Sequence, residues 1–151
     1  MTNPHPTIIP GLRSPYELVG MVVHFGRMLD KIRLNAEGKL PAEWVAAKGI
    51  ENPRSFDSRC CNFLKIDYAE LETETLKGRT DSEMLEWAFL HGRRPSEDEI
   101  QIWNAFMMKL GWRDPIKERV TIRLAEIGMP PGTVETMFDF IDLDEGRALR
   151  Y

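Results

Sequence analysis

The chain has 151 residues, of which 42% are hydrophobic and 29% charged, and its formal net charge is −4. This length and composition fit one globular domain and exclude a disordered chain. The negative charge argues against nucleic acid as a partner, because proteins that bind the phosphate backbone usually carry a basic excess. The longest apolar stretch, residues 18–25, contains His24 and is too short to span a bilayer, so we expect no membrane association.

The first residues indicate an extended segment rather than a helix. Pro4, Pro6 and Pro10 fix the backbone and remove hydrogen-bond donors, so residues 1–13 are expected to form an extended N-terminal arm over the domain. The segment also lacks the basic and apolar regions of a signal peptide, which favours a cytoplasmic location. Residues 14–151 are expected to form a single helical domain.

Capping patterns and glycines predict where the helices begin and end. Ser14-Pro15-Tyr16-Glu17 resembles a capping box and predicts a helix from about Pro15 to Ala36, ending near Gly38. Further helix starts are predicted at Pro41, Asp57, Asp67, Thr80, Ser96, Asp114 and Gly132-Thr133. Alternation typical of strands is missing, so we predict an all-α fold, a compact bundle of about seven or eight helices.

Three motifs occur in order along the chain: RMLDK at residues 27–31, EMLEW at residues 83–87 and MFDFIDLD at residues 137–144. Together they resemble a bacterial family known as domain of unknown function 5069. The resemblance extends from about Arg13 to Asp144 and implies a bacterial, cytoplasmic protein, without an activity or a catalytic residue to carry over. Within that pattern, Cys60-Cys61 and residues 145–147 look like variable details.

The first predicted helix is apolar on two sides. Leu18, Met21, Val22, Phe25, Met28, Leu29 and Ile32 fall within one broad arc that is expected to face the core. A second apolar strip leaves a narrow polar seam that includes Gly20, His24, Arg27 and Lys31. A helix of this kind is expected at the centre of the bundle.

Arg27 and Lys31 lie one turn apart on this seam, where like charges repel unless a negative group is near. Asp30 lies on the neighbouring side, and Asp139 and Asp142 project from the last helix. One interpretation is an internal ion-pair network that joins the first and last helices. Another is a site for a carboxylate or phosphate, with Arg27 as the forked donor. A third is plain exposure to solvent.

Other polar residues give weaker signals for a metal or a reactive group. The acidic run from Asp139 to Glu145 fails the calcium-loop pattern, because Gly146 comes one place early and the chain ends before the last required glutamate. Cys60 and Cys61 lack the C-x-x-C spacing, and core packing is favoured over a reactive thiol for at least one of them. His91 fits a helix C-terminus better than catalysis. We expect no metal and no cofactor.

Two functions remain open at this point, together with a question of assembly. The first is a non-enzymatic binding or interaction domain, since no nucleophile and base pair can be identified. The alternative is an enzyme or sensor for a small anionic metabolite, in a cleft lined by the first and last helices. Its candidate ligand-binding residues are His24, Arg27, Asp30, Lys31, Asp139 and Asp142. The oligomeric state is left open, with a homo-oligomer through aromatic surface as one possibility.

Overall fold

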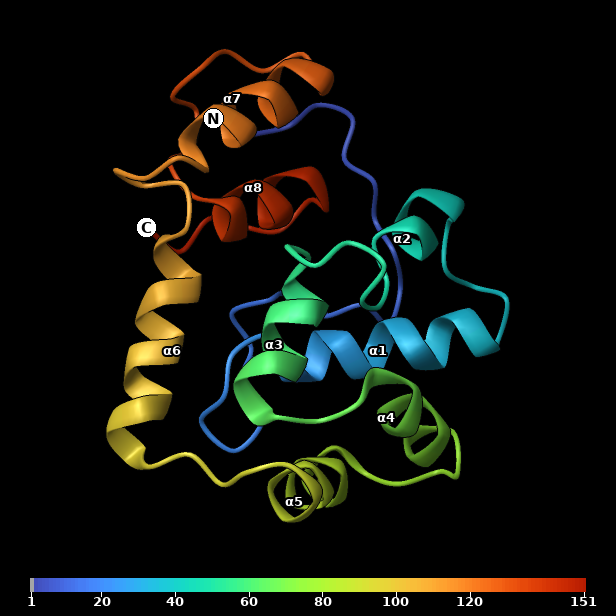
Figure 1. Ribbon diagram of the computed structural model, residues 1–151. Coiled ribbons are helices and arrows are strands. Elements are labelled where there is room, and N and C mark those ends of the chain that lie inside the picture. The colour runs from blue at the N-terminus through green and yellow to red at the C-terminus, as the bar shows by residue number, and fades with distance from the viewer. Residues whose placement is uncertain (1) are drawn as a thin grey trace.

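The structure is a computed structural model that describes residues 2–151 (Figure 1). Over these residues the chain forms eight helices: α1 (Phe25–Ala36), α2 (Ala42–Ala46), α3 (Phe56–Leu64), α4 (Tyr68–Thr75), α5 (Asp81–His91), α6 (Glu97–Lys109), α7 (Lys117–Glu126) and α8 (Met137–Asp144). No strand forms within residues 2–151, where the only β-type pairing is an isolated bridge between Val19 and Val22. The prediction of an all-α domain is confirmed.

Three helices begin where their capping residues predict. Asp67 accepts a hydrogen bond from the backbone of Glu70 at the start of α4, and full capping boxes join Thr80 to Glu83 before α5 and Ser96 to Glu99 before α6. These side chains satisfy backbone N–H groups that the first turn of a helix leaves without partners. The starts of α4, α5 and α6 are therefore set by local sequence.

The first helix begins at Phe25, and the prediction of a start at Pro15 is wrong. Ser14 does accept a hydrogen bond from the backbone N–H of Tyr16 at 3.2 Å, as a turn-forming serine would. The helix does not continue, because the carbonyl oxygen of Pro15 accepts instead from the backbone N–H of His24 at 2.9 Å. Residues 14–24 therefore form a folded loop.

Left-handed backbone conformations interrupt this loop. The φ angles of Gly20, Met21 and His24 are 50°, 76° and 69°, values that a right-handed helix does not contain. Val19 and Val22 close the turn between them with two backbone hydrogen bonds of 3.1 and 2.9 Å. The apolar pattern of this stretch thus resembles that of a helix although the backbone is turned.

The loop is held in place by α6 and places two apolar residues outside the core. Leu18 and Met21, which were expected to face the core, are 49% and 65% exposed. The side-chain amide of Asn104 donates to the carbonyl oxygen of Met21 at 2.7 Å and accepts from the backbone N–H of Val23 at 3.1 Å. Because Asn104 is far away in sequence, the capping pattern at Ser14 gives no sign of it.

The last helix also begins later than predicted. It starts at Met137 with Thr136 as its cap, rather than at Gly132-Thr133. Thr133 belongs to a turn instead, where its hydroxyl donates to the carbonyl oxygen of Pro130 at 2.6 Å. The number and order of the helices are unaffected.

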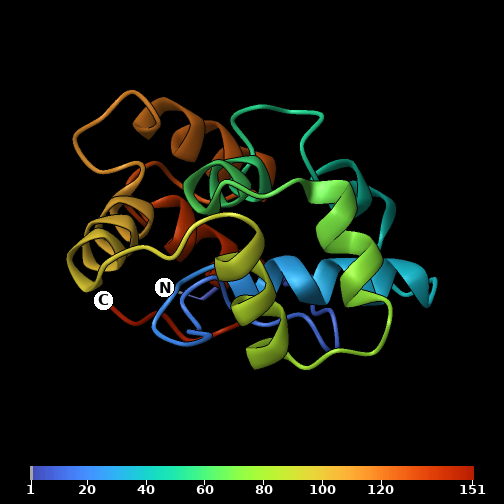
Figure 2. The same cartoon turned by 60° about the horizontal axis from the view of Figure 1, so that its bottom comes forward.

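The prediction that the first helix is central is confirmed. α1 runs through the middle of the domain and contacts α2, α3, α4 and α5, while α6 and α7 both contact α8 (Figures 1 and 2). Phe25, Met28 and Leu29 have no exposed surface. A separate apolar cluster packs α7 on α8 and includes Val120, Leu124, Phe140 and Leu143. None of the helices in the described part of the chain is long and apolar enough to cross a membrane.

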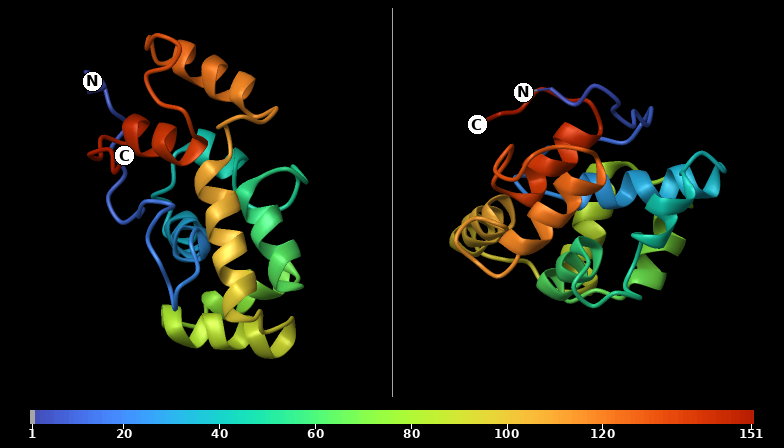
Figure 3. Two further views of the ribbon diagram at one scale, coloured as in Figure 1. Left: turned by 90° about the vertical axis from the view of Figure 1, so that its left-hand side faces the viewer. Right: turned by 90° about the horizontal axis from the view of Figure 1, so that it is seen from above.

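Residues 2–13 form no helix and lie against the domain. A small apolar cluster joins them to the end of α1 and the loop after it, and consists of Ile9, Leu12, Leu34 and Leu40. The backbone N–H of Thr7 donates to the carbonyl oxygen of Asp144 at 2.8 Å. The two ends of the chain therefore lie on the same side of the molecule, near α8 (Figure 3).

Candidate functional site

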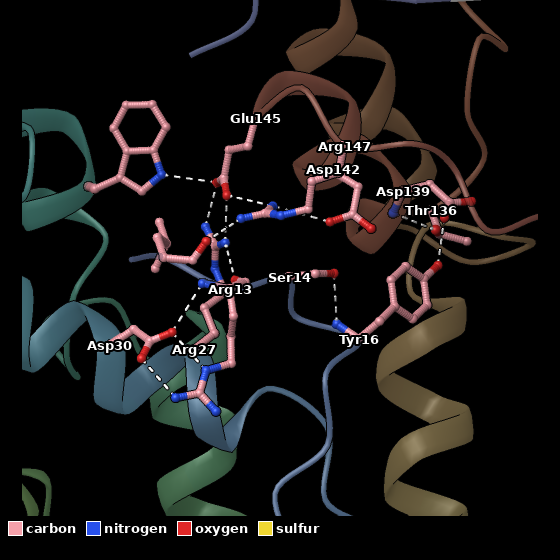
Figure 4. Close-up of polar contacts among 12 residues, drawn as sticks. Arg13, Ser14, Tyr16, Arg27, Asp30, Thr136, Asp139, Asp142, Glu145 and Arg147 are labelled. Carbon is pink, nitrogen blue, oxygen red and sulfur yellow. Dashed lines mark hydrogen bonds and ion pairs between the residues drawn. The ribbon is translucent and has the colours of Figure 1, made fainter. Parts of the chain in front are cut away.

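Arg27 is buried and bound by Glu145, the residue that ends α8 (Figure 4). Its Nη1 and Nη2 atoms donate to Oε1 and Oε2 of Glu145 at 2.8 and 2.6 Å, a two-pronged pair with strong geometry. Nη1 also donates to the carbonyl oxygen of Arg13 at 3.1 Å. The side chains of Arg27 and Glu145 are only 5% and 2% exposed, so this pair fastens α1 to α8 inside the protein.

Glu145 collects two further donors. The indole Nε1 of Trp44 donates to it at 3.2 Å, and Nη1 of Arg147 donates at 2.8 Å. The same Arg147 atom lies 3.2 Å from Oδ1 of Asp142. Burial alone would raise the pKa of Glu145, but the guanidinium groups of Arg27 and Arg147 outweigh burial and hold that pKa below its ordinary value. Glu145 is thus an ionised centre shared by several donors.

Lys31 and His24 share a different carboxylate, that of Asp57 near the start of α3. Nζ of Lys31 and Nε2 of His24 lie 2.9 and 2.8 Å from Oδ1 of Asp57. The other oxygen, Oδ2, accepts from the backbone N–H of Gly49 at 2.8 Å. All three side chains are buried, and that of Asp57 is completely so. This cluster therefore fastens α1 to α3.

The protonation of this cluster follows from burial. Burial lowers the pKa of His24 to about 4 and outweighs the opposing effect of Asp57, so the ring is neutral at pH 7. Burial also lowers the pKa of Lys31, against the opposing effect of Asp57. For Asp57, burial would raise the pKa, but Lys31 and His24 hold it below its ordinary value. Neutral His24 then donates from Nε2, and its buried Nδ1 has no hydrogen-bond partner.

Asp30 binds the N-terminal segment rather than Arg27 or Lys31, and its only ion pair within α1 is a long one of 3.9 Å to Arg33. Its Oδ2 accepts from the backbone N–H of Arg13 at 3.0 Å and from Nε at 2.8 Å, and its Oδ1 accepts from Nη2 at 2.9 Å. The remaining Arg13 nitrogen, Nη1, lies 2.8 Å from Oδ2 of Asp81 in α5. Asp30 thus fixes residue 13 against α1 and α5.

Asp139 and Asp142 lie on α8 but serve separate groups (Figure 4). Oδ1 of Asp139 accepts from the hydroxyl of Tyr16 at 2.6 Å, and burial raises the pKa of Tyr16, so this phenol remains a donor. Asp142 pairs with Arg147, and burial raises its pKa in spite of that arginine. The six predicted residues therefore do not converge on one cleft.

An ion-pair network does join the first and last helices, although through Glu145, a residue expected to be a variable detail of the sequence. Glu145, and not Asp139 or Asp142, receives Arg27. One signal was available, because Glu145 follows Asp142 by three residues and helical residues at that spacing share a face. Asp57 was interpreted only as a helix start, and nothing in its local sequence indicates that Lys31 is its partner.

Two surface hollows lie along α6, and neither is lined by Arg27 or Lys31. One, of about 540 Å³, lies between α3 and α6 and is lined by Pro53, Arg54, Arg59, Asn62, Phe63, Trp103 and Phe106. The other, of about 500 Å³, lies between α6 and α8 and includes Tyr16, Asn104, Met108, Trp112, Glu135, Thr136, Asp139 and Tyr151. We call them the α3–α6 hollow and the α6–α8 hollow. Of the predicted site residues, only Asp139 borders either hollow.

The remaining candidate groups are held as structural residues. Cys60 and Cys61 are buried free thiols, and burial raises the pKa of both, to about 12 for Cys61. Nδ1 of His91 lies 3.0 Å from the carbonyl oxygen of Trp87, and the two rings are stacked. Within residues 2–151, no three His, Cys, Asp or Glu side chains are grouped as a metal ion would require.

Comparison with known proteins gives a family and no activity. No curated protein matches the chain. The model of the family described as Domain of unknown function (DUF5069) matches residues 9–147, a range that contains both Arg27 and Glu145. The chain therefore belongs to the DUF5069 family, as its three motifs suggested.

Proposed function

We propose that this protein is a non-enzymatic binding domain and that it binds through the surface of α6. The observation that carries the proposal is that both hollows border this one helix. Each combines aromatic walls with a few polar groups, which is the usual composition of a site for a small organic ligand. Apolar side chains are also exposed along this side, at Ile102, Phe106 and Trp112.

The buried cations of α1, Arg27 and Lys31, offer less support for a binding function. Both terminal nitrogens of Arg27 are hydrogen-bonded to Glu145, and Lys31 is paired with Asp57. Neither cation has more than a few per cent of exposed surface. An anionic metabolite at this place would have to displace a buried carboxylate. Removing one partner of a buried pair is costly, so the alternative of an anion site on the seam is the weaker proposal.

The state of the nucleophilic groups supports a role without catalysis. A cysteine reacts as its thiolate, and the raised pKa values of Cys60 and Cys61 keep both as thiols. The hydroxyl of Tyr16 is engaged by Asp139 and likewise has a raised pKa. Buried free thiols also support the cytoplasmic location in a bacterium that we infer from the family resemblance.

The proposal is tested by mapping ligand contacts in two-dimensional amide NMR spectra. The probe is a panel of small amines, neutral aromatics and aromatic acids, and amide shifts are expected to concentrate on α6 and the residues that face it. Trp112→Ala should weaken binding of panel members in the α6–α8 hollow. Ile122→Ala is the matched control, because Trp112 and Ile122 are 43% and 45% exposed but Ile122 lies on α7.

Two results would overturn the proposal. One is a set of shifts confined to surfaces away from α6. The other is turnover of panel members by the purified protein, which would identify an enzyme. The exposed side chains of Ile102 and Phe106 also favour self-association through α6. Sedimentation of the wild type and of Ile102→Glu would measure it.

A further inference from the structure

We infer that the α3–α6 hollow binds a small planar aromatic anion, with its ring against Phe106 and its acidic group on Arg54 and Arg59. The inference rests on the proposed function and names a ligand class for one of the two hollows. The anionic ligand expected from the sequence would then bind Arg54 and Arg59 and not Arg27 and Lys31 of α1.

Three aromatic side chains form one wall of the hollow. Phe63 of α3 and Trp103 of α6 are stacked, with ring centres 4.7 Å apart and planes at 4°. The guanidinium of Arg93 lies over Phe63, 4.8 Å from the ring centre, and its Nε donates to the carbonyl oxygen of Phe63 at 2.7 Å. Phe106 is half exposed at the edge of the hollow. Trp103 and Arg93 cover the two faces of Phe63, and Trp103 is only 6% exposed, so Phe106 is the ring that is open to a flat ligand.

Arg54 and Arg59 can pair with a ligand anion, in contrast to Arg27 and Lys31 of α1, which are paired with buried carboxylates. Within residues 2–151, neither Arg54 nor Arg59 forms an ion pair with a carboxylate. Arg59 is oriented by its neighbours, since its Nε donates to the carbonyl oxygen of Arg54 at 3.2 Å and its guanidinium lies 5.8 Å from the ring centre of Phe106. Its terminal nitrogens remain for a ligand.

Charge and shape together select the ligand. The charged side chains that line this hollow are both positive, and Asn62 adds a neutral polar group. A guanidinium binds carboxylate or phosphate oxygens through paired hydrogen bonds, and aromatic rings bind a planar ring system. The hollow has a volume of about 540 Å³ and is shallow and open, so it would cover one side of a small ligand. An aromatic carboxylate and a nucleoside monophosphate share this chemistry.

The test is titration calorimetry with four probes on the full chain. Indole-3-acetate and adenosine 5′-monophosphate carry both a ring and an anion, adenosine carries the ring alone, and inorganic phosphate carries the anion alone. The two complete probes are expected to bind at least about tenfold more tightly than adenosine or phosphate. Their relative affinity distinguishes a carboxylate ligand from a phosphate ligand.

Matched variants separate this site from general attraction of anions. Arg59→Ala and Phe106→Ala should each weaken binding of the complete probes by about tenfold or more. Arg119→Ala removes an unpaired exposed cation from α7, and Ile122→Ala removes an apolar side chain from the same helix that is about as exposed as Phe106, 45% against 48%. Both control variants should bind as the wild type does.

Three outcomes would overturn the inference. They are failure of the complete probes to bind at millimolar concentration, equal binding of adenosine and its monophosphate, and equal weakening by Arg59→Ala and Arg119→Ala. Any of these could occur while panel members still shift amides along α6. The wider proposal of a binding surface on α6 would then stand without this ligand class.

Discussion

His24 is the one buried histidine of the described residues, since His5 and His91 are exposed. Its side chain is 1% exposed, so water cannot reach the ring. Its backbone is left-handed, and its Nε2 atom is hydrogen-bonded to Asp57. Its ring adjoins a carboxylate and also Lys31, which is held by the same carboxylate oxygen. Adding a proton to the ring would therefore place a second cation beside Lys31 without water to solvate it.

Acid should weaken the protein through His24. The pKa of this ring is about 4 when folded and about 6.5 when unfolded, so the unfolded chain binds the proton more readily. The free energy of unfolding should be unaffected by this group above about pH 6.5 and fall by up to about 1.4 kcal/mol per pH unit between 6.5 and 4. Urea unfolding at a series of pH values measures the slope.

The control for this prediction is His24→Gln, which keeps a neutral N–H donor and cannot titrate. Carboxylates such as Asp142, whose pKa is raised by burial, oppose the loss of stability at the acid end and do so in both proteins. The difference between wild type and variant isolates His24. Equal slopes in the two proteins would show that the ring does not govern the response to acid.

The Arg27–Glu145 pair should respond unequally to loss of either partner. Glu145→Gln leaves the buried Arg27 without a carboxylate and is expected to cost about 3–5 kcal/mol. Arg27→Met should cost less, because Glu145 keeps Arg147 and Trp44 as donors. Chemical unfolding measures both, and Glu86→Gln, which breaks an exposed pair with Arg94, should leave the midpoint nearly unchanged. A larger loss for Arg27→Met than for Glu145→Gln would contradict this assignment of donors.

Among the elements, helices with local capping chemistry were predictable and the loop before α1 was not. Thr80 and Ser96 bind backbone groups three residues away, so a short window of sequence contains the whole interaction. The turn at residues 19–22 depends on Asn104 of α6, and Glu145 is the partner of Arg27 from the other end of the chain. The charge of Arg27 and Lys31 predicts that acids lie near, but only the fold determines which acids.

The dependence of the loop on α6 can be tested at Asn104. Asn104→Asp keeps an acceptor for the backbone N–H of Val23 but loses the donor to Met21, and it sets a negative charge against the Met21 carbonyl oxygen. We expect a loss of about 0.5–1.5 kcal/mol in the free energy of unfolding, because the lost hydrogen bond is exposed. Gln101→Glu makes the same chemical change on the same helix at an exposed residue and should have little effect. Similar losses in both variants would mean that the change of charge on α6, and not the loss of the hydrogen bond to Met21, is responsible.

At the scale of the whole molecule, polar side chains reinforce the connections between three apolar clusters, the first two of which also meet at Ile116. One apolar cluster surrounds α1, another lies between α7 and α8, and a third holds the N-terminal segment. Arg27 with Glu145 connects the first two, and Arg13 with Asp30 connects the third to α1. This division accounts for the burial of Arg27 and Asp30, whose pairs connect clusters, whereas Lys31 and His24 pair with Asp57 inside the first cluster.

The N-terminal segment is therefore expected to be part of the folded unit. Deletion of residues 1–13 removes the buried Ile9 and Leu12, each worth about 1.5–3 kcal/mol, and leaves Asp30 without Arg13. A loss of this size is comparable with the whole stability of a small domain, so the shortened chain should be largely unfolded by circular dichroism at room temperature. Deletion of residues 1–5, which stops before Ile9, is the control and should keep the wild-type melting temperature within a few degrees. If both deletions melt like the full chain, the segment is a dispensable arm, and the burial of Ile9 and Leu12 contributes little to holding the domain together.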